Sequence, residues 1–177
     1  TTTQAAGAQT VLTLDSDYGW STESGCVRWN GSTSVAGGSC YGTGIWGGDE
    51  ITGGGQTQTI TLASAGIDSA GDVTILFRAL ESGGQTGITV NNLVLRIYSS
   101  AGSVLFTSGN LAAPVVFAST NSSTYYVFRL DAGDQAAAGS AFANPSNRIG
   151  LAALVSGASG GPESFLIGMA ETNTPEP

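Results

Sequence analysis

The chain contains no lysine and no histidine, and each absence excludes a class of chemistry. Without histidine there is no Ser-His-Asp or Cys-His catalytic arrangement and no histidine ligand for zinc. Without lysine there is no Schiff-base chemistry and no phosphate-loop lysine. Paired carboxylates, as in glycosidases, are the main catalytic design that remains. Because no pattern in the sequence brings two carboxylates face to face, we expect a protein that is not an enzyme.

Charge is also scarce, since charged residues make up 10% of the 177 residues, against about 25% in typical soluble domains. Five arginines are the only cations and the formal net charge is −8. This balance repels phosphates, so nucleic acid is not an expected partner. Low charge leaves little repulsion to oppose self-association. No apolar run is long enough to cross a bilayer, so we expect no membrane span in this chain.

Only two cysteines are present, Cys26 and Cys40, separated by a segment rich in glycine and serine. A redox pair usually reads Cys-x-x-Cys, and a metal site usually needs further ligands that this chain lacks. A structural disulfide, typical of proteins in an oxidising compartment, is therefore the favoured interpretation.

Strand-like segments separated by glycine- and serine-rich turns account for most of the chain. The expected strands are residues 10–14, 57–62, 72–80, 92–99, 104–108, 123–131, 148–156 and 163–170. One alanine-rich segment, 131–143, begins with Asp131, a good N-cap, and predicts a short helix. No linker divides residues 1–177. The pattern predicts a single all-β domain, an antiparallel, jelly-roll-like β-sandwich with one short helix and a disulfide-stapled loop.

Carboxylates gather in two places that suit a hard cation. Asp15 and Asp17 flank Ser16, and Asp131 and Asp134 bracket a short Ala-Gly step. Clustered oxygen ligands suit Ca²⁺, which makes these four residues candidate metal ligands and Ca²⁺ the one candidate cofactor. The alternative is turn and cap chemistry, which aspartate also favours.

Aromatic residues are concentrated in the first quarter of the chain. Trp20, Trp46 and Tyr41 are candidates for stacking on sugar rings, with Tyr18 and Trp29 nearby in sequence. The alternative is that these rings pack a glycine-rich lobe or contact another copy of the protein.

The first nine residues carry no charge, and the first apolar cluster follows directly as Val11, Leu12 and Leu14. A floppy leader is the default expectation for a terminus. A sharper hypothesis makes residues 1–14 a strand donated to a neighbouring copy, with these three residues as self-assembly anchors. Head-to-tail donation does not close on itself and therefore builds filaments. An ordinary first strand within the same domain is the competing interpretation.

Two segments match the acceptor sequence for asparagine-linked sugar. They begin at Asn30 and Asn121, which are candidate glycosylation sites.

The chain begins at Thr1 and ends with residues 171–177, Glu-Thr-Asn-Thr-Pro-Glu-Pro. This ending resembles the Pro-Glu-Pro of PEP-CTERM proteins, secreted bacterial proteins sorted by the membrane enzyme exosortase. Segments 128–131, 147–151 and 160–165 resemble the closing portion of some ectodomains in that family. The resemblance implies an exported, surface-processed protein, with 171–177 as the remnant of a sorting signal. It implies no reaction.

These observations together favour a protein located outside the cell or at its surface. We expect a structural subunit of an extracellular filament or of a surface or biofilm matrix, assembled with other copies of itself by β-strand or edge contacts. The alternative is an extracellular carbohydrate-binding module whose partner is a polysaccharide, and a glycosidase ranks behind both.

Overall fold

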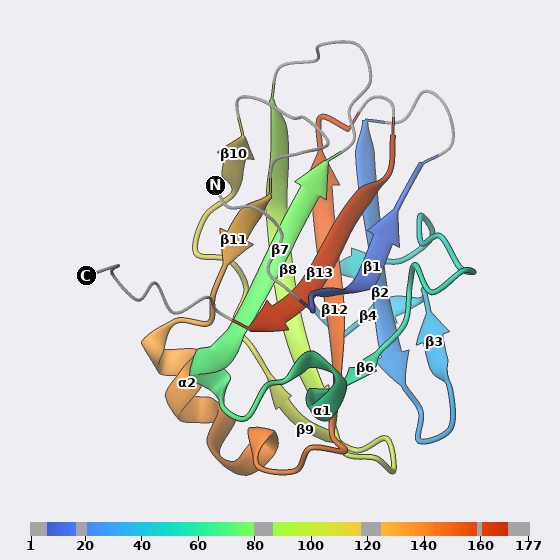
Figure 1. The fold of residues 1–177 in the computed structure, drawn as a ribbon. Helices are drawn as coiled ribbons and strands as arrows, with labels where there is room; N and C mark the ends of the chain where they lie inside the picture. The colour runs from blue at the N-terminus through green and yellow to red at the C-terminus, as the bar shows by residue number, and fades with distance from the viewer. Residues whose placement is uncertain (1–6, 17–20, 80–86, 118–124, 159–160, 170–177) are drawn as a thin grey trace.

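Two antiparallel β-sheets pack face to face in a computed structural model, which describes residues 7–16, 21–79, 87–117, 125–158 and 161–169 (Figure 1). The smaller sheet has the strand order β1 (Gln9–Leu14), β13 (Glu163–Met169), β7 (Val73–Ala79) and β11 (Tyr126–Phe128). The expected all-β sandwich is confirmed.

The larger sheet has the order β10 (Val115–Phe117), β8 (Ile88–Tyr98), β12 (Arg148–Ser156), β2 (Thr22–Trp29) and β3 (Ser34–Ala36). Strand β9 (Val104–Thr107) also pairs with β8, and β6 (Ile60–Thr61) also pairs with β12. Because β12 occupies one side of β8, β9 and β10 share its other side. A separate hairpin is formed by β4 (Ser39–Cys40) and β5 (Ile45–Trp46).

The main core lies between the two sheets and follows the alternation of strand side chains. In β8 this alternation changes phase at a β-bulge, where Leu154 pairs with Asn92 but Val155 pairs with Val90. Asn91 is the extra residue. Because of the bulge, Val90 on one side of it and Leu93 on the other side both face the core. A long strand that lacks strict period-two alternation thus keeps its apolar side chains inward.

The short helices close one end of the sandwich (Figure 1). Helix α2 (Ala132–Ala138) was expected, and the Asp131 side chain caps it by accepting a hydrogen bond from the Asp134 N–H at 2.8 Å. It continues into a 3₁₀ turn, η2 (Gly139–Phe142), where Phe142 is buried. A further 3₁₀ turn, η1 (Ala70–Asp72), precedes β7.

Two expected strands are shorter than their patterns predict. The strand expected at 57–62 is limited to β6, because the Thr61 hydroxyl accepts a hydrogen bond from the Ser64 N–H and starts helix α1 (Leu62–Ala65). The strand expected at 123–131 is limited to β11 within its described part, since Asp131 is committed to the helix cap.

The first strand belongs to the chain's own core, which corrects the donated-strand hypothesis. Strand β1 pairs with β13, and the self-assembly candidates Val11, Leu12 and Leu14 are fully buried in the main core. On the other side of β1 the segment 49–58 supplies backbone bonds, from the Ile51 N–H to the Thr13 carbonyl at 2.9 Å and from the Gln58 N–H to the Val11 carbonyl at 3.0 Å. The three anchors are thus already occupied within the domain. Residues 1–6 and 171–177 lie outside the described residues.

Within the described part of the chain, no helix combines the length and the apolar character needed to cross a membrane.

Candidate functional site

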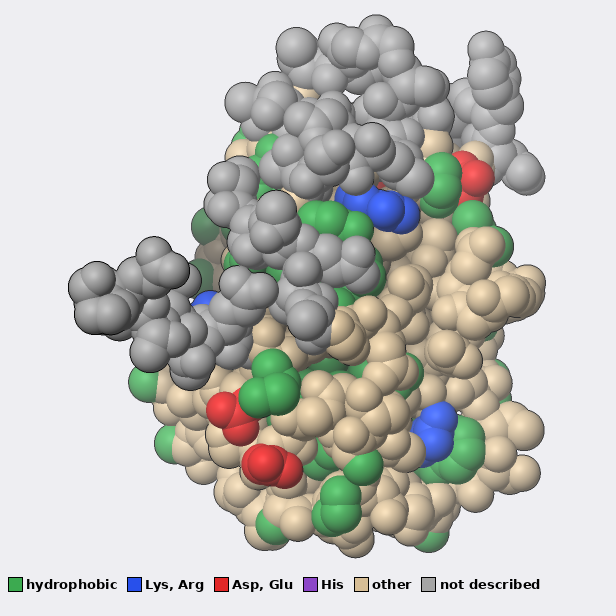
Figure 2. Space-filling view, viewed as in Figure 1, with side chains coloured by type: hydrophobic (Ala, Val, Ile, Leu, Met, Phe, Trp, Pro, Cys, Tyr) green, Lys and Arg blue, Asp and Glu red, His purple; other side chains and the backbone are tan. Residues whose placement is uncertain are grey.

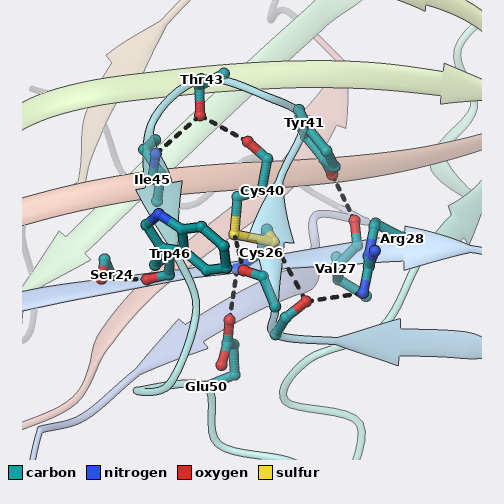
Figure 3. Close-up of a disulfide and its surroundings, with 12 residues drawn as sticks. Ser24, Cys26, Val27, Arg28, Cys40, Tyr41, Thr43, Ile45, Trp46 and Glu50 are labelled. Carbon is teal, nitrogen blue, oxygen red and sulfur yellow. Dashed lines mark hydrogen bonds between the residues drawn. A yellow bond between two sulfur atoms is a disulfide. The ribbon is translucent and has the colours of Figure 1, made fainter.

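Residues 37–48, here called the flap, carry the β4–β5 hairpin and fold over the outer face of the larger sheet (Figure 3). Side chains of the hairpin alternate between a buried face and an exposed face. Cys40 and Ile45 are buried in a small second core that includes Val94 of β8 and Ala152 of β12. Ser39 and Trp46, on the opposite face of the hairpin, point to solvent. The flap is therefore a layer added outside the sandwich.

The expected disulfide is confirmed and fastens the flap to β2. Cys26 and Cys40 are bonded, with their Cα atoms 5.6 Å apart, and both residues are buried. Among the described residues they also form, with Glu50, the one group of three side chains that could hold a metal ion. Because the two sulfur atoms are bonded to each other, this group is not a metal–thiolate site.

Two adjacent acidic side chains accept hydrogen bonds from backbone N–H groups of β2, along the part of its edge that pairs with no described strand. The Ser24 N–H donates to Asp49 at 2.8 Å. The Cys26 N–H donates to Glu50 at 2.7 Å (Figure 3). These carboxylates replace the carbonyl groups of a missing neighbouring strand. Their role is to satisfy the backbone, and the geometry does not make them a catalytic pair.

Tyr41 projects from the flap onto β2 and β12 with an unusual backbone conformation. Its φ is 62°, in the left-handed region that few residues other than glycine adopt. Its hydroxyl donates to the Val27 carbonyl, and the Arg96 guanidinium lies 4.3 Å from its ring centroid. Gly150 of β12 leaves the space for the phenol, because a Cβ there would lie 2.7 Å from the Tyr41 hydroxyl oxygen.

Burial is the largest influence on the pKa values of Tyr41 and of its neighbour Tyr98. It raises the pKa of Tyr41 well above 10.0, with Tyr98 adding to the rise and Arg96 and Arg28 opposing it. Burial also raises the pKa of Tyr98, and its hydrogen bond with Tyr41 and the nearby Arg96 and Arg28 oppose this rise. Both phenols are therefore neutral at physiological pH. We call Arg28, Arg96, Tyr41 and Tyr98 the arginine–tyrosine cluster.

Three of the five arginines lie on this side of the larger sheet, and each is held by neutral groups. Arg28 donates to the Gly37 carbonyl at 2.9 Å, and Arg96 donates to the Thr107 hydroxyl at 2.9 Å. Arg148 donates to the Thr59 carbonyl at 2.7 Å and stacks 4.1 Å from the Trp29 ring centroid. Among the described residues, none of the three is paired with a carboxylate. The nearest acidic groups that the structure places beside β2, Asp49 and Glu50, accept hydrogen bonds from backbone N–H groups instead.

The two predicted sugar-stacking residues that the structure describes, Trp46 and Tyr41, do not form one platform. Trp46 is 68% exposed on the outer face of the flap and is available to a ligand. Tyr41 is half-buried, with its ring under Arg96 and its hydroxyl committed to β2. Trp20 lies outside the described residues. The arginines that surround Tyr41 had no signal in the sequence, because they come from strands far apart along the chain.

Two of the predicted calcium ligands, Asp131 and Asp134, accept backbone hydrogen bonds at a helix cap and a turn. Asp131 caps α2, Asp134 accepts a hydrogen bond from the Gly109 N–H at 3.0 Å, and the N–H of exposed Asp15 donates to the Asp49 carbonyl at 2.9 Å. Asp17 falls outside the described part of the chain. Asp15 follows β1 of the smaller sheet, whereas Asp131 and Asp134 lie at the start of α2, where they have the alternative role of cap and turn residues.

One of the two candidate glycosylation sites is described. Asn30 is exposed, and its side-chain oxygen accepts a hydrogen bond from the Ser32 N–H at 2.9 Å in the β2–β3 turn. An exposed turn is accessible to a modifying enzyme, so the site remains a candidate. Asn121 is not among the described residues.

Comparison with known proteins gives no relative: no family, no curated protein and no solved structure matches this chain.

Proposed function

We propose that this protein is a structural subunit of an extracellular filament or of a surface or biofilm matrix, and that copies associate through one side of the sandwich. The supporting observation is where apolar side chains are exposed. Four of the six large apolar residues that are exposed in the described chain lie on β9, β10 and β11. They are Val104, Leu105, Val116 and Val127.

Strands β10 and β11 lie next to each other at one side of the molecule, here called the β10–β11 side, and β9 lies further along the same edge of β8, near α2 (Figure 1). Strands β9 and β10 are edge strands of the larger sheet, and β11 is an edge strand of the smaller one. Inward rings join the two edges, with the Phe117 and Tyr126 centroids 3.9 Å apart. The outward residues are Val116, 68% exposed, and Val127, 38% exposed.

Sheet edges of soluble proteins are usually protected by charge, by proline or by a covering segment. None of the residues in β9, β10 and β11 is charged, and one proline, Pro114, precedes β10. In the smaller sheet the opposite edge is different, because the segment 49–58 covers β1, whereas no described strand pairs with the outer edge of β11. The contrast favours association at the β10–β11 side by edge contacts.

The surface is consistent with a protein that self-associates. Figure 2 shows few acidic and basic side chains among the described residues on the face in view. The disulfide supports an oxidising location, and the resemblance of the last residues to PEP-CTERM proteins supports export.

The test compares one substitution on the β10–β11 side with a matched substitution elsewhere. Val116→Lys adds a charge at the edge of the larger sheet, and Met169→Lys adds the same charge at an exposed apolar residue of β13. We expect fibres or large assemblies of the wild type and of Met169→Lys in electron micrographs, and monomers of Val116→Lys. Assemblies of equal size from all three proteins would contradict the proposal.

Exposed Trp46 supports a second candidate function, an extracellular carbohydrate-binding module. The indole stands on a flap that is fixed by a disulfide, so little ordering is needed for a sugar ring to stack on it. Trp46→Ala should abolish retention on a polysaccharide that retains the wild type, with unchanged thermal unfolding. Equal retention of both proteins would exclude this use of Trp46.

A further inference from the structure

We propose that the arginine–tyrosine cluster binds the carboxylate of an acidic saccharide, with Trp46 contacting a neighbouring sugar ring. The inference rests on the second candidate function and names its ligand class. It adds Arg28 and Arg96 as the residues that select the charge.

The cluster holds more hydrogen-bond donors than acceptors. Each guanidinium has five N–H groups. Arg28 donates one bond, to Gly37, and Arg96 donates two, to the Thr107 hydroxyl and the Tyr41 carbonyl. The Arg28 Nε is buried without a hydrogen-bond partner, whereas the Tyr98 hydroxyl interacts with Tyr41 and Arg96. Because buried donors are normally satisfied, this surplus marks a place that an anion would stabilise.

The two guanidinium groups are held in position before any ligand arrives. Arg96 is fixed by bonds to β9 and to the flap, and by its stacking on the Tyr41 ring. Arg28 is fixed by the flap carbonyl at Gly37. The left-handed backbone of Tyr41 costs free energy, which is typical of positions that serve a site. Donors that are already oriented lose little entropy when they bind a planar carboxylate.

Trp46 of β5 contacts β2, the strand that carries Arg28, at its other end. The Ser24 hydroxyl donates to the Trp46 carbonyl at 2.6 Å, and Ser24, Cys26 and Arg28 alternate onto the outer face of β2. With about 3.3 Å per residue, the Cα atoms of Ser24 and Arg28 are about 13 Å apart. A short saccharide chain is the kind of ligand that presents a ring to the indole and a carboxylate to the arginines.

The negative net charge of the protein does not cancel this local attraction. At physiological ionic strength charges separated by more than about 8 Å are largely screened, so a ligand carboxylate at the cluster is attracted by Arg28 and Arg96 and opposed chiefly by Glu50, which binds the Cys26 N–H nearby. A long polyphosphate such as nucleic acid would extend beyond the cluster. Because three of the five arginines already lie on this side, the rest of this acidic protein offers few cations for the remaining phosphates. A short uronate places its charge only where the arginines are.

The experiment observes the side-chain Nε–H signals of Arg28, Arg96 and Arg129 in ¹⁵N-labelled wild-type protein. Exposed Arg129 follows β11 and serves as the internal control. Oligogalacturonate, its methyl-esterified form and oligothymidylate are titrated separately. We expect saturable shifts at Arg28 and Arg96 with oligogalacturonate alone, and none at Arg129. Equal shifts at all three arginines, equal response to the neutral ester, or tighter binding of oligothymidylate would overturn the inference.

Substitutions then measure each contribution. Arg28→Gln or Arg96→Gln should weaken oligogalacturonate binding about tenfold or more, the effect of losing a hydrogen bond to a charged group, whereas Arg129→Gln should not change it. The wild-type titration decides the question even if a variant fails to fold. Shifts of the Trp46 indole with both the acid and its ester, without charge selectivity, would retain sugar binding as a function while refuting the arginine site.

Discussion

Removing the disulfide gives a direct measure of how strongly the flap is tied to the sandwich. Cys26 and Cys40 are 14 positions apart, so the bridge closes a loop of about 15 residues in the unfolded chain. In the chain-entropy treatment such a bridge stabilises the folded state by about 3 kcal/mol. For a chain of this size each kcal/mol corresponds to about 2–4 °C in Tm, so Cys26→Ala/Cys40→Ala should melt about 6–12 °C lower.

Thermal unfolding followed by circular dichroism, with and without a reductant, is the assay. The reductant should lower the Tm of the wild type by a similar amount and leave the double variant unchanged. The main core between the sheets does not include the flap, so the reduced protein should still fold cooperatively. A wild-type Tm that is insensitive to full reduction would refute the assignment of the bridge as a stabilising link.

Three further perturbations test the packing described above. Gly150→Ala should destabilise the protein by about 1–3 kcal/mol in urea unfolding, because the new Cβ would overlap the Val27 carbonyl and the Tyr41 hydroxyl. Leu12→Ala should cost about 2–5 kcal/mol in the same assay, since Leu12 is fully buried in the chain's own core, and a cost near zero would show that β1 is not packed there. Tyr41 holds its proton more tightly in the folded than in the unfolded chain, so its contribution to stability should be complete below pH about 10 and be lost as the pH rises through the raised folded-state pKa. Tyr41→Phe should flatten this alkaline loss, and an unchanged pH profile would contradict the burial of the phenol.

Sequence patterns located the elements whose signal is local. Strands such as β7 and β12 are continuous apolar runs, and α2 has an aspartate cap before an alanine-rich segment, so both types could be predicted. Strand β2 was missed because its sequence, TESGCVRW, lacks a regular apolar alternation. It forms because β12 pairs along it and because Asp49 and Glu50 satisfy its other edge. Such support comes from residues far away in sequence.

The candidate site was predictable only in part for the same reason. The disulfide followed from two isolated cysteines, and the exposure of Trp46 is consistent with a binding role. The arginine–tyrosine cluster could not be predicted, since Arg28, Arg96 and Tyr41 meet only when β2, β8 and the flap are in place. The role of β1 was ambiguous, because a strand with buried apolar residues has the same sequence whether its sheet belongs to its own chain or to a neighbour.

Amide hydrogen exchange tests the central proposal, association through the β10–β11 side, most directly. Exchange would be compared between dilute monomer and concentrated, assembled protein, with peptides assigned to each edge. The account predicts that assembly slows exchange in β9, β10 and β11, whose edges it covers, and leaves β1 unchanged, because residues 49–58 already cover that strand. Assembly that leaves β9, β10 and β11 unchanged while slowing exchange elsewhere would contradict it.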